Sequence, residues 1–191
     1  MYRIFRGKHL IILSSNAKHL VKFEPDFLYK RPTQKQIKEA LRVSKKSRRP
    51  LTILMLGNAE KMLQQIVDEF QYVEAGGGIV ENYKRKILLM KRLGKWDLPK
   101  GKSKKNENKQ TCAMREVEEE TGAQGLSIIE PFAETYHTYY RNRKWQLKHT
   151  FWYLMKCDEG KNLTPQIEED IEEVRWVKHT KINITELNTY P

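Results

Sequence analysis

Residues 101–123 constrain the fold more than any other stretch of the chain. Within GKSKKNENKQTCAMREVEEETGA, the three carboxylates of Glu116, Glu119 and Glu120 stand at i, i+3 and i+4. On a helix they project from one face within about one turn, where they repel one another. A solvated helix face with an Arg115–Glu119 ion pair relieves only one of the three. A hard divalent cation would satisfy all of them, because Mg²⁺ takes oxygen ligands from carboxylates and phosphates.

The whole segment from Gly101 to Ala123 resembles the Nudix box. Each fixed position of that motif is met, and Ala123 stands where a larger aliphatic residue is usual. The resemblance implies the α/β fold class, as a Nudix α/β/α sandwich with a mixed sheet. It also implies a pyrophosphohydrolase that splits a diphosphate linkage, with Mg²⁺, or alternatively Mn²⁺, held by Glu116, Glu119 and Glu120.

Other positions of the motif receive supporting roles from the same resemblance. Glu107 and Arg115 are expected to orient the metal ligands, and Gly101 to give the turn that leaves a strand. Gly122 is expected to end the helix in the left-handed conformation, and Asn106 or Asn108 to cap its start.

The reaction also needs a general base that takes a proton from the attacking water. Within the family this base is sometimes a glutamate of the box and sometimes a carboxylate on a distant loop. The candidates here are Glu116, Glu119 and the acidic stretch QIEEDIEEVRW. That stretch offers Glu168, Glu169 and Asp170, of which we select Glu169. The catalytic set expected from the sequence is therefore Glu116, Glu119, Arg115 and Glu169.

Two features near the motif bear on the substrate. The preceding WDLPKGK resembles dinucleoside polyphosphate hydrolases, and Lys100 and Lys102 could neutralise a phosphate chain or compensate the acidic helix. Tyr139 and Tyr140 lie where such relatives carry a tyrosine beyond the box, and they could stack on a base or pack on the sheet. We expect a nucleotide substrate, with a dinucleoside polyphosphate slightly ahead of oxidised or unusual nucleoside triphosphates.

The formal charge of +12 is unevenly spread along the chain. Residues 1–70 hold 15 Lys and Arg against 6 Asp and Glu, whereas residues 71–191 hold 21 against 18. The basic N-terminal third could bind nucleic acid, although no RNA-recognition or helix-turn-helix signature is seen there. Two alternative functions follow: a Nudix-like module that binds a ligand, RNA or a partner, and an RNA 5′-end pyrophosphohydrolase.

The pattern of apolar and polar residues changes near residue 70. Residues 1–70 read as a small basic α/β domain with a hairpin at Gly7-Lys8, two helices and a buried strand, and residues 71–191 as the Nudix domain. Gly76, Gly77 and Gly78 mark a close backbone approach in a strand. No apolar run reaches membrane-spanning length, so a cytoplasmic protein without membrane contact is expected. Cys112 and Cys157 have no metal-site spacing and are expected to be reduced and packed.

Overall fold

The computed structural model describes residues 1–159, 162–182 and 188–189 and divides the chain into two compact units. Unit 1 comprises residues 1–73 and 135–149, and unit 2 comprises residues 74–134 and the described residues from 150 on. The division into functional domains at residue 70 stays a prediction. The sequence pattern did not indicate that residues 135–149 group with the N-terminal segment.

Unit 1 is built from short strands and three helices. They are β1 (Tyr2–Arg6), β2 (His9–Ser14), α1 (His19–Phe23), β3 (Phe27–Lys30), α2 (Gln34–Lys46), β4 (Thr52–Leu56) and α3 (Ala59–Val67), together with parts of β5 (Gln71–Asn82), β9 (Gln124–Arg141) and β10 (Lys144–Glu159). β1 pairs antiparallel with β2 and parallel with β9, and β4 lies between β2 and β3, parallel to both. The expected hairpin at Gly7-Lys8 is confirmed, while β3 and α1 were not predicted.

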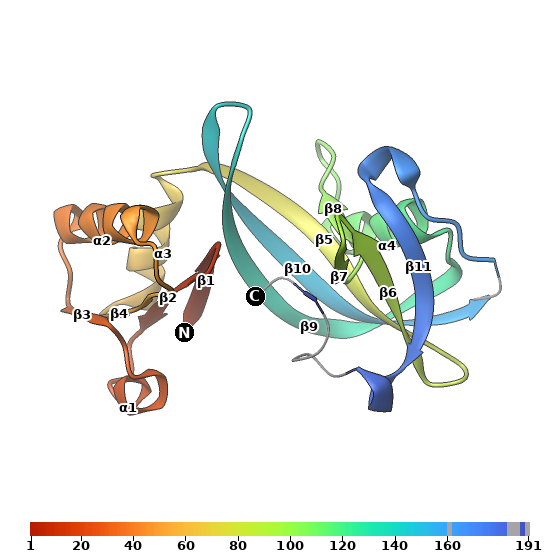
Figure 1. The fold of residues 1–191 in the computed structure, drawn as a ribbon, viewed down its shortest axis with the longest axis horizontal. Helices are drawn as coiled ribbons and strands as arrows, with labels where there is room; N and C mark the ends of the chain where they lie inside the picture. The colour runs from red at the N-terminus through yellow and green to blue at the C-terminus, as the bar shows by residue number, and fades with distance from the viewer. Residues whose placement is uncertain (160–161, 183–187, 190–191) are drawn as a thin grey trace. The chain divides into compact units, whose positions relative to one another are not determined.

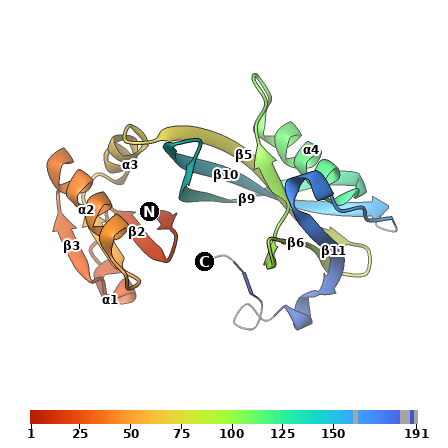
Figure 2. The ribbon, with the colours of Figure 1, turned by 45° about the horizontal axis from the view of Figure 1, so that its top comes forward.

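The helices of unit 1 begin at capping residues and bury one apolar face. Thr33 forms a capping box with Gln36 at the start of α2, and the Asn58 side chain accepts a hydrogen bond from the Lys61 amide at the start of α3. α2 and α3 cover the same face of the unit 1 sheet (Figure 1 and Figure 2). The buried side chains from both layers form one apolar core, which includes Ile11, Leu13, Ile37, Leu41, Ile53, Met55, Met62 and Ile66.

Unit 2 contains the segment that resembles the Nudix box. Its elements are β6 (Lys86–Arg92), β7 (Lys95–Asp97), β8 (Lys100–Lys102), α4 (Lys109–Thr121), the 3₁₀ helix η1 (Ile167–Glu169), β11 (Ile171–Lys178) and η2 (His179–Lys181), with the remaining parts of β5, β9 and β10. β6 pairs antiparallel with β11, β5 and β7, and β5 pairs antiparallel with β8. The short strands β7 and β8 were not predicted.

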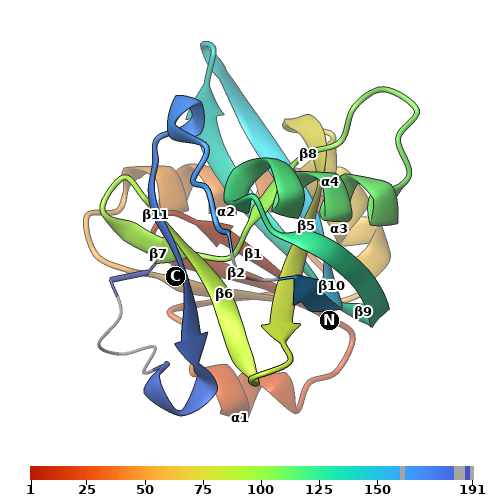
Figure 3. The same ribbon diagram turned by 90° about the vertical axis from the view of Figure 1, so that its right-hand side faces the viewer.

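α4 lies against β5 and β8 (Figure 3). A Cβ at Gly76 would lie 2.5 Å from the Ala113 backbone nitrogen and 2.9 Å from the Lys109 carbonyl oxygen, so only glycine permits this approach. The close approach expected at Gly76 is therefore confirmed. The apolar side of α4, with Ala113 and Val117, packs into the unit 2 core.

The predicted α/β class with a mixed sheet is confirmed. Cys112 and Cys157 are buried and not disulfide-bonded, as expected. Among the described helices, none has both the length and the hydropathy to cross a membrane.

Candidate active site

Both ends of α4 carry capping residues. At the start, the Asn108 side chain accepts a hydrogen bond of 2.8 Å from the Thr111 amide. At the end, Gly122 adopts the left-handed conformation with φ 70° and its amide donates to the Glu118 carbonyl. Of the two asparagines considered, Asn108 is the cap. These caps fix which turn of the helix carries each carboxylate.

The three glutamates of α4 have different surroundings. Glu116 and Glu120, one turn apart, are 9% and 1% exposed, whereas the Glu119 side chain is 41% exposed. Burial is the largest influence on both buried groups: it raises the pKa of Glu116, and it raises the pKa of Glu120 to about 7. A nearby cation would stabilise the charged forms of these two poorly hydrated carboxylates. Their role as metal ligands stays a prediction.

Arg115 holds three carboxylates at once. Its Nε and Nη2 donate to the two oxygens of Glu107 at 2.7 and 2.8 Å, and its Nη1 donates to Glu116 and Glu119, both at 2.7 Å. The hydrogen bonds from Arg115 lower the pKa of Glu107 to about 2. Burial alone would raise the pKa of Glu119. The hydrogen bonds from Arg115 and Lys104 outweigh burial and hold this pKa below its usual value. Arg115 thereby fixes the orientation of Glu116 and Glu119 from one guanidinium.

Glu120 is held from the neighbouring strand. Its Oε2 accepts a hydrogen bond of 2.7 Å from the backbone amide of Lys100 in β8. The ammonium of Lys100 does not bond to Glu120 and instead lies 2.6 Å from Asp97. Sequence reasoning gave Asp97 no role, although it stands in the quoted WDLPKGK. The proposed contact of Lys100 with substrate stays a prediction.

Gly101 lies within β8, not at a turn as the resemblance implied. A Cβ at this position would overlap the Glu116 carboxylate. Gly101 therefore leaves the space that Glu116 occupies beside Arg115. Its neighbour Lys102 is exposed, and the Lys102 carbonyl accepts a hydrogen bond of 3.1 Å from Arg115 Nη2.

The loop selected as a source of the general base lies within electrostatic range of α4. The charge of Glu169, in η1, adds to the rise in the pKa of Glu116. Glu169 also pairs with Arg92 at 3.4 Å, and about half of its side chain is exposed. The structure thus brings Glu169 near Glu116. Its catalytic role stays a prediction.

The carboxylates of α4 suit a hard divalent cation in their chemistry. Arg115 is shared among Glu107, which precedes α4, and Glu116 and Glu119 of the helix. Among the described residues, the carboxylate of the almost fully buried Glu120 accepts a hydrogen bond only from a backbone amide. Within the described ranges, no three His, Cys, Asp or Glu side chains are already arranged as a ligand set. In this arrangement Glu116 and Glu119 point at Arg115. The residues fit the implied ion in type and burial.

Tyr139 and Tyr140 belong to unit 1. Lys148 lies over the Tyr139 ring at 5.8 Å, and Tyr140 lies 5.6 Å from the Trp145 ring. Their predicted contact with substrate stays a prediction.

Comparison with known proteins places the site in a family context. Residues 72–190 match the NUDIX domain. An mRNA-decapping protein g5R of African swine fever virus is 36% identical over 85 residues, which cover 41% of this chain and 34% of the viral protein. An m7GpppN-mRNA hydrolase of Saccharomyces cerevisiae is 30% identical over 113 residues, which cover 58% of this chain and 11% of the yeast protein. The matched segments thus span about a third and about a tenth of these relatives.

A solved structure gives a similar match. A NUDIX hydrolase from Nitrosomonas europaea is 28% identical, with a TM-score of 0.46, and the match covers 62% of this chain and 64% of that chain.

Proposed function

Since this chain belongs to the Nudix family, we propose that it is a divalent-cation-dependent pyrophosphohydrolase acting on the capped 5′ end of RNA. The observation that carries the proposal is the arrangement on α4, where Arg115 orients Glu116 and Glu119 beside the buried Glu120. A binding module would not need a shared guanidinium that fixes several carboxylates in place.

The reaction is hydrolysis of a phosphoric anhydride. A water oxygen attacks phosphorus, the P–O bond to the leaving phosphate breaks, and a carboxylate takes the proton of the water. The base is one of Glu116, Glu119 and Glu169. Glu116, Glu119 and Glu120 would hold the ion, and a bound Mg²⁺ supplies positive charge against the phosphate oxygens. Arg115 and Glu107 keep Glu116 and Glu119 in position.

Two observations support RNA as the substrate. The relatives are named for decapping and for m7GpppN-mRNA hydrolysis. A strongly basic unit 1 also suits a substrate with many phosphates, because neutralising each phosphate releases counterions.

The second candidate is the dinucleoside polyphosphate that the sequence favoured. It contains the same kind of linkage as an m7GpppN cap, namely two nucleosides joined through a phosphate chain. WDLPKGK with Lys100 favours it. The two candidates therefore differ in whether the RNA body contributes to recognition.

A steady-state comparison of substrates tests the proposal. The full chain is assayed with and without Mg²⁺ on cap-labelled RNA, the free cap dinucleotide, diadenosine tetraphosphate and nucleoside triphosphates. We expect Mg²⁺-dependent cleavage with kcat/KM highest for capped RNA. A higher value for diadenosine tetraphosphate would favour the second candidate, and no cleavage of any substrate by the folded protein would refute pyrophosphohydrolase activity on these compounds.

A further inference from the structure

The excess of positive over negative charge lies in unit 1. Residues 1–73 and 135–149 hold 19 Lys and Arg against 6 Asp and Glu, a formal charge of +13. The rest of the chain holds 17 against 18, a formal charge of −1. Unit 1 therefore attracts polyanions independently of the acidic helix in unit 2.

Aromatic and cationic side chains from three parts of unit 1 meet at Trp145. Arg6 of β1 lies over the Trp145 ring with its Cζ 4.3 Å from the centroid, and the Lys45 ammonium of α2 lies 5.7 Å from it. The Tyr140 ring is 5.6 Å from Trp145 and tilted by 56°. Tyr140 is 60% exposed, so its ring offers an open face to a ligand.

Arg6 is a buried cation that has no acidic partner among the described residues. It is 7% exposed and lies between Phe70 and Trp145, and its Nε has no hydrogen-bond partner among the described residues. Buried charges are usually paired, because desolvation costs more than contact with aromatic rings returns. Thr138, in register with Arg6, also has a buried hydroxyl for which the described part of the chain offers no hydrogen-bond partner. This part of unit 1 thus carries uncompensated positive charge and unsatisfied donors.

The turn next to Trp145 is strained by an arginine. Asn142 and Arg143 connect β9 to β10 with φ values of 52° and 60°. Two consecutive positive φ angles are those of a type I′ turn, in which glycine is favoured at the second position. Among the described residues, no ion pair involves Arg141, Arg143 or Lys144. Arg143 adopts a backbone conformation that disfavours arginine, and its charge has no ion-pair partner among the described residues. We interpret this combination as a sign that the guanidinium binds a ligand.

We propose that unit 1 binds the single-stranded body of an RNA at the hairpin-tip site, formed by Arg6, Lys45, Tyr140, Arg143 and Trp145. Bases stack on Tyr140 and Trp145, phosphates contact Lys45 and Arg143, and the charge of Arg6 strengthens the field beneath the Trp145 ring. Cations interleaved with exposed aromatic rings are the pattern of single-strand recognition. The choice of RNA rests on the proposed function, whereas the binding itself needs no hydrolysis.

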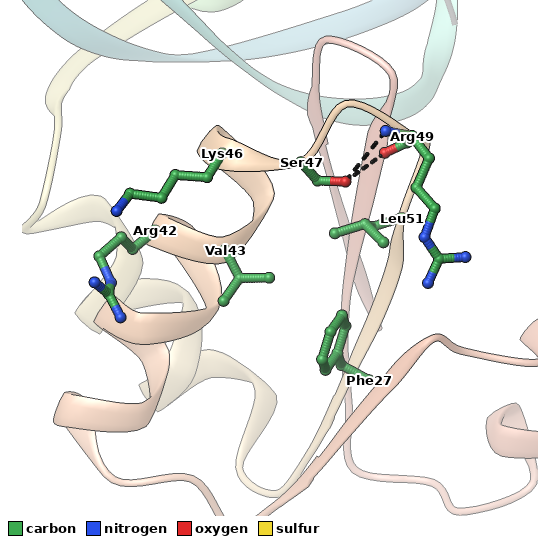
Figure 4. Close-up of a pocket in the computed structure, with 7 residues that line it drawn as sticks. All are labelled: Phe27, Arg42, Val43, Lys46, Ser47, Arg49 and Leu51. Atoms are coloured by element: carbon green, nitrogen blue, oxygen red, sulfur yellow. Dashed lines mark hydrogen bonds between the residues drawn. The ribbon is translucent and has the colours of Figure 1, made fainter.

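The second half of α2 extends this basic surface. Beside Lys45, its residues Arg42 and Lys46 line a pocket of about 360 Å³, to which Arg49 and Phe27 also contribute. In Figure 4, Arg42 and Lys46 lie to one side of Phe27, and Arg49 lies to the other. Phe27 is 37% exposed, so a second aromatic surface lies among cations. A strand longer than the hairpin-tip site could continue along α2.

Equilibrium binding of an uncapped RNA tests this proposal. The full chain without divalent cation is titrated into a fluorescein-labelled short single-stranded RNA, and anisotropy is followed at several salt concentrations. Because each phosphate contact on a single strand contributes a slope of about −0.7 in log K against log salt, Arg143→Gly should weaken binding about fivefold at about 0.1 M salt. The Tm of this variant should equal or exceed that of the wild type, since glycine relieves the turn. If Arg143 had only a structural role, Arg143→Gly would not weaken RNA binding without also lowering the Tm.

Two further variants on α2 form a matched pair. Lys45→Ser should weaken binding like Arg143→Gly, whereas Lys35→Ser removes the same charge from an exposed position near the other end of the helix and should leave affinity near the wild-type value. Equal affinity of Arg143→Gly and the wild type would overturn the proposal. Tighter binding of duplex than of single-stranded RNA would overturn it too, because paired bases cannot stack on Tyr140.

Hydrolysis of the free cap dinucleotide separates this proposal from the proposed function. The dinucleotide has no RNA body, so Arg143→Gly should cleave it at the wild-type rate. RNA binding without cap hydrolysis would refute the proposed function alone. Cap hydrolysis with RNA affinity insensitive to Arg143→Gly would refute the hairpin-tip site alone.

Discussion

Gly101→Ala should displace the Glu116 carboxylate while leaving the backbone of β8 intact. The new Cβ would overlap that carboxylate and would lie 2.6 Å from its Oε1, whereas real Cβ contacts essentially never fall below 3.0 Å. The obstructing atoms are at the end of a flexible side chain, so Glu116 can rotate away. In doing so it leaves the Arg115 Nη1, to which it is bonded at 2.7 Å.

The size of the effect follows from that bond and that displacement. A lost hydrogen bond between charged groups costs about 1.5–3 kcal/mol of unfolding free energy, an upper value here because Glu116 can find water after rotating. A misplacement of about 1 Å in a catalytic group costs about 10²-fold in rate. We therefore expect a folded variant with modestly reduced stability and kcat lowered about 10²-fold, with the loss in kcat larger than any change in KM.

Steady-state kinetics on the preferred substrate and urea unfolding measure the two effects separately. Gly94→Ala is the matched control, because nothing lies within 4 Å of a Cβ at that position. Its loss of stability comes only from placing alanine at a φ of 73°. The control should lose stability, by about 1 kcal/mol, and keep its kcat. Wild-type kcat in folded Gly101→Ala would refute the reasoning that the missing side chain of Gly101 leaves the space that the Glu116 carboxylate needs.

Three further substitutions test the structural basis of the site. Gly76→Ala should destabilise the fold far more than Gly101→Ala, because its Cβ meets the backbone of α4, which cannot move aside alone; circular dichroism melting would show this. Asn108→Ala should cost about 1 kcal/mol in urea unfolding through loss of the helix cap. The pKa of Glu107 is lowered to about 2, so its charge stabilises the fold above the usual pKa of a glutamate, and that contribution is lost as pH falls toward 2. The stability deficit of Glu107→Gln should therefore be largest near neutral pH and shrink in acid.

The helix that carries the site could be predicted from local sequence because its signals are local. Asn108, Gly122 and the glutamate spacing act within α4 itself, and each is found where the pattern placed the helix. The different environments of Glu116, Glu119 and Glu120 could not be predicted, since they depend on how α4 packs against β8. For the same reason the role of Gly101 was assigned to a turn, when its neighbour in space is Glu116.

The charge distribution shows a second limit of local sequence reading. A count on either side of residue 70 gave excess charges of +9 and +3. Residues 135–149, which carry four cations and no acid, group with the N-terminal segment through the parallel pairing of β9 with β1. Periodicity within β9 carries no information about that distant pairing. The separation of a basic unit from a nearly neutral one is therefore visible only in the fold.

The most direct test of the central claim is the rate of Mg²⁺-dependent hydrolysis by Glu120→Gln. The amide oxygen of glutamine can still accept the hydrogen bond from the Lys100 amide, so the fold should be retained, while the site loses a negative ligand for a hard cation. We expect a melting curve close to that of the wild type and loss of metal-dependent turnover on every substrate that the wild type cleaves. Wild-type turnover by folded Glu120→Gln would contradict the assignment of the metal and catalytic site to α4.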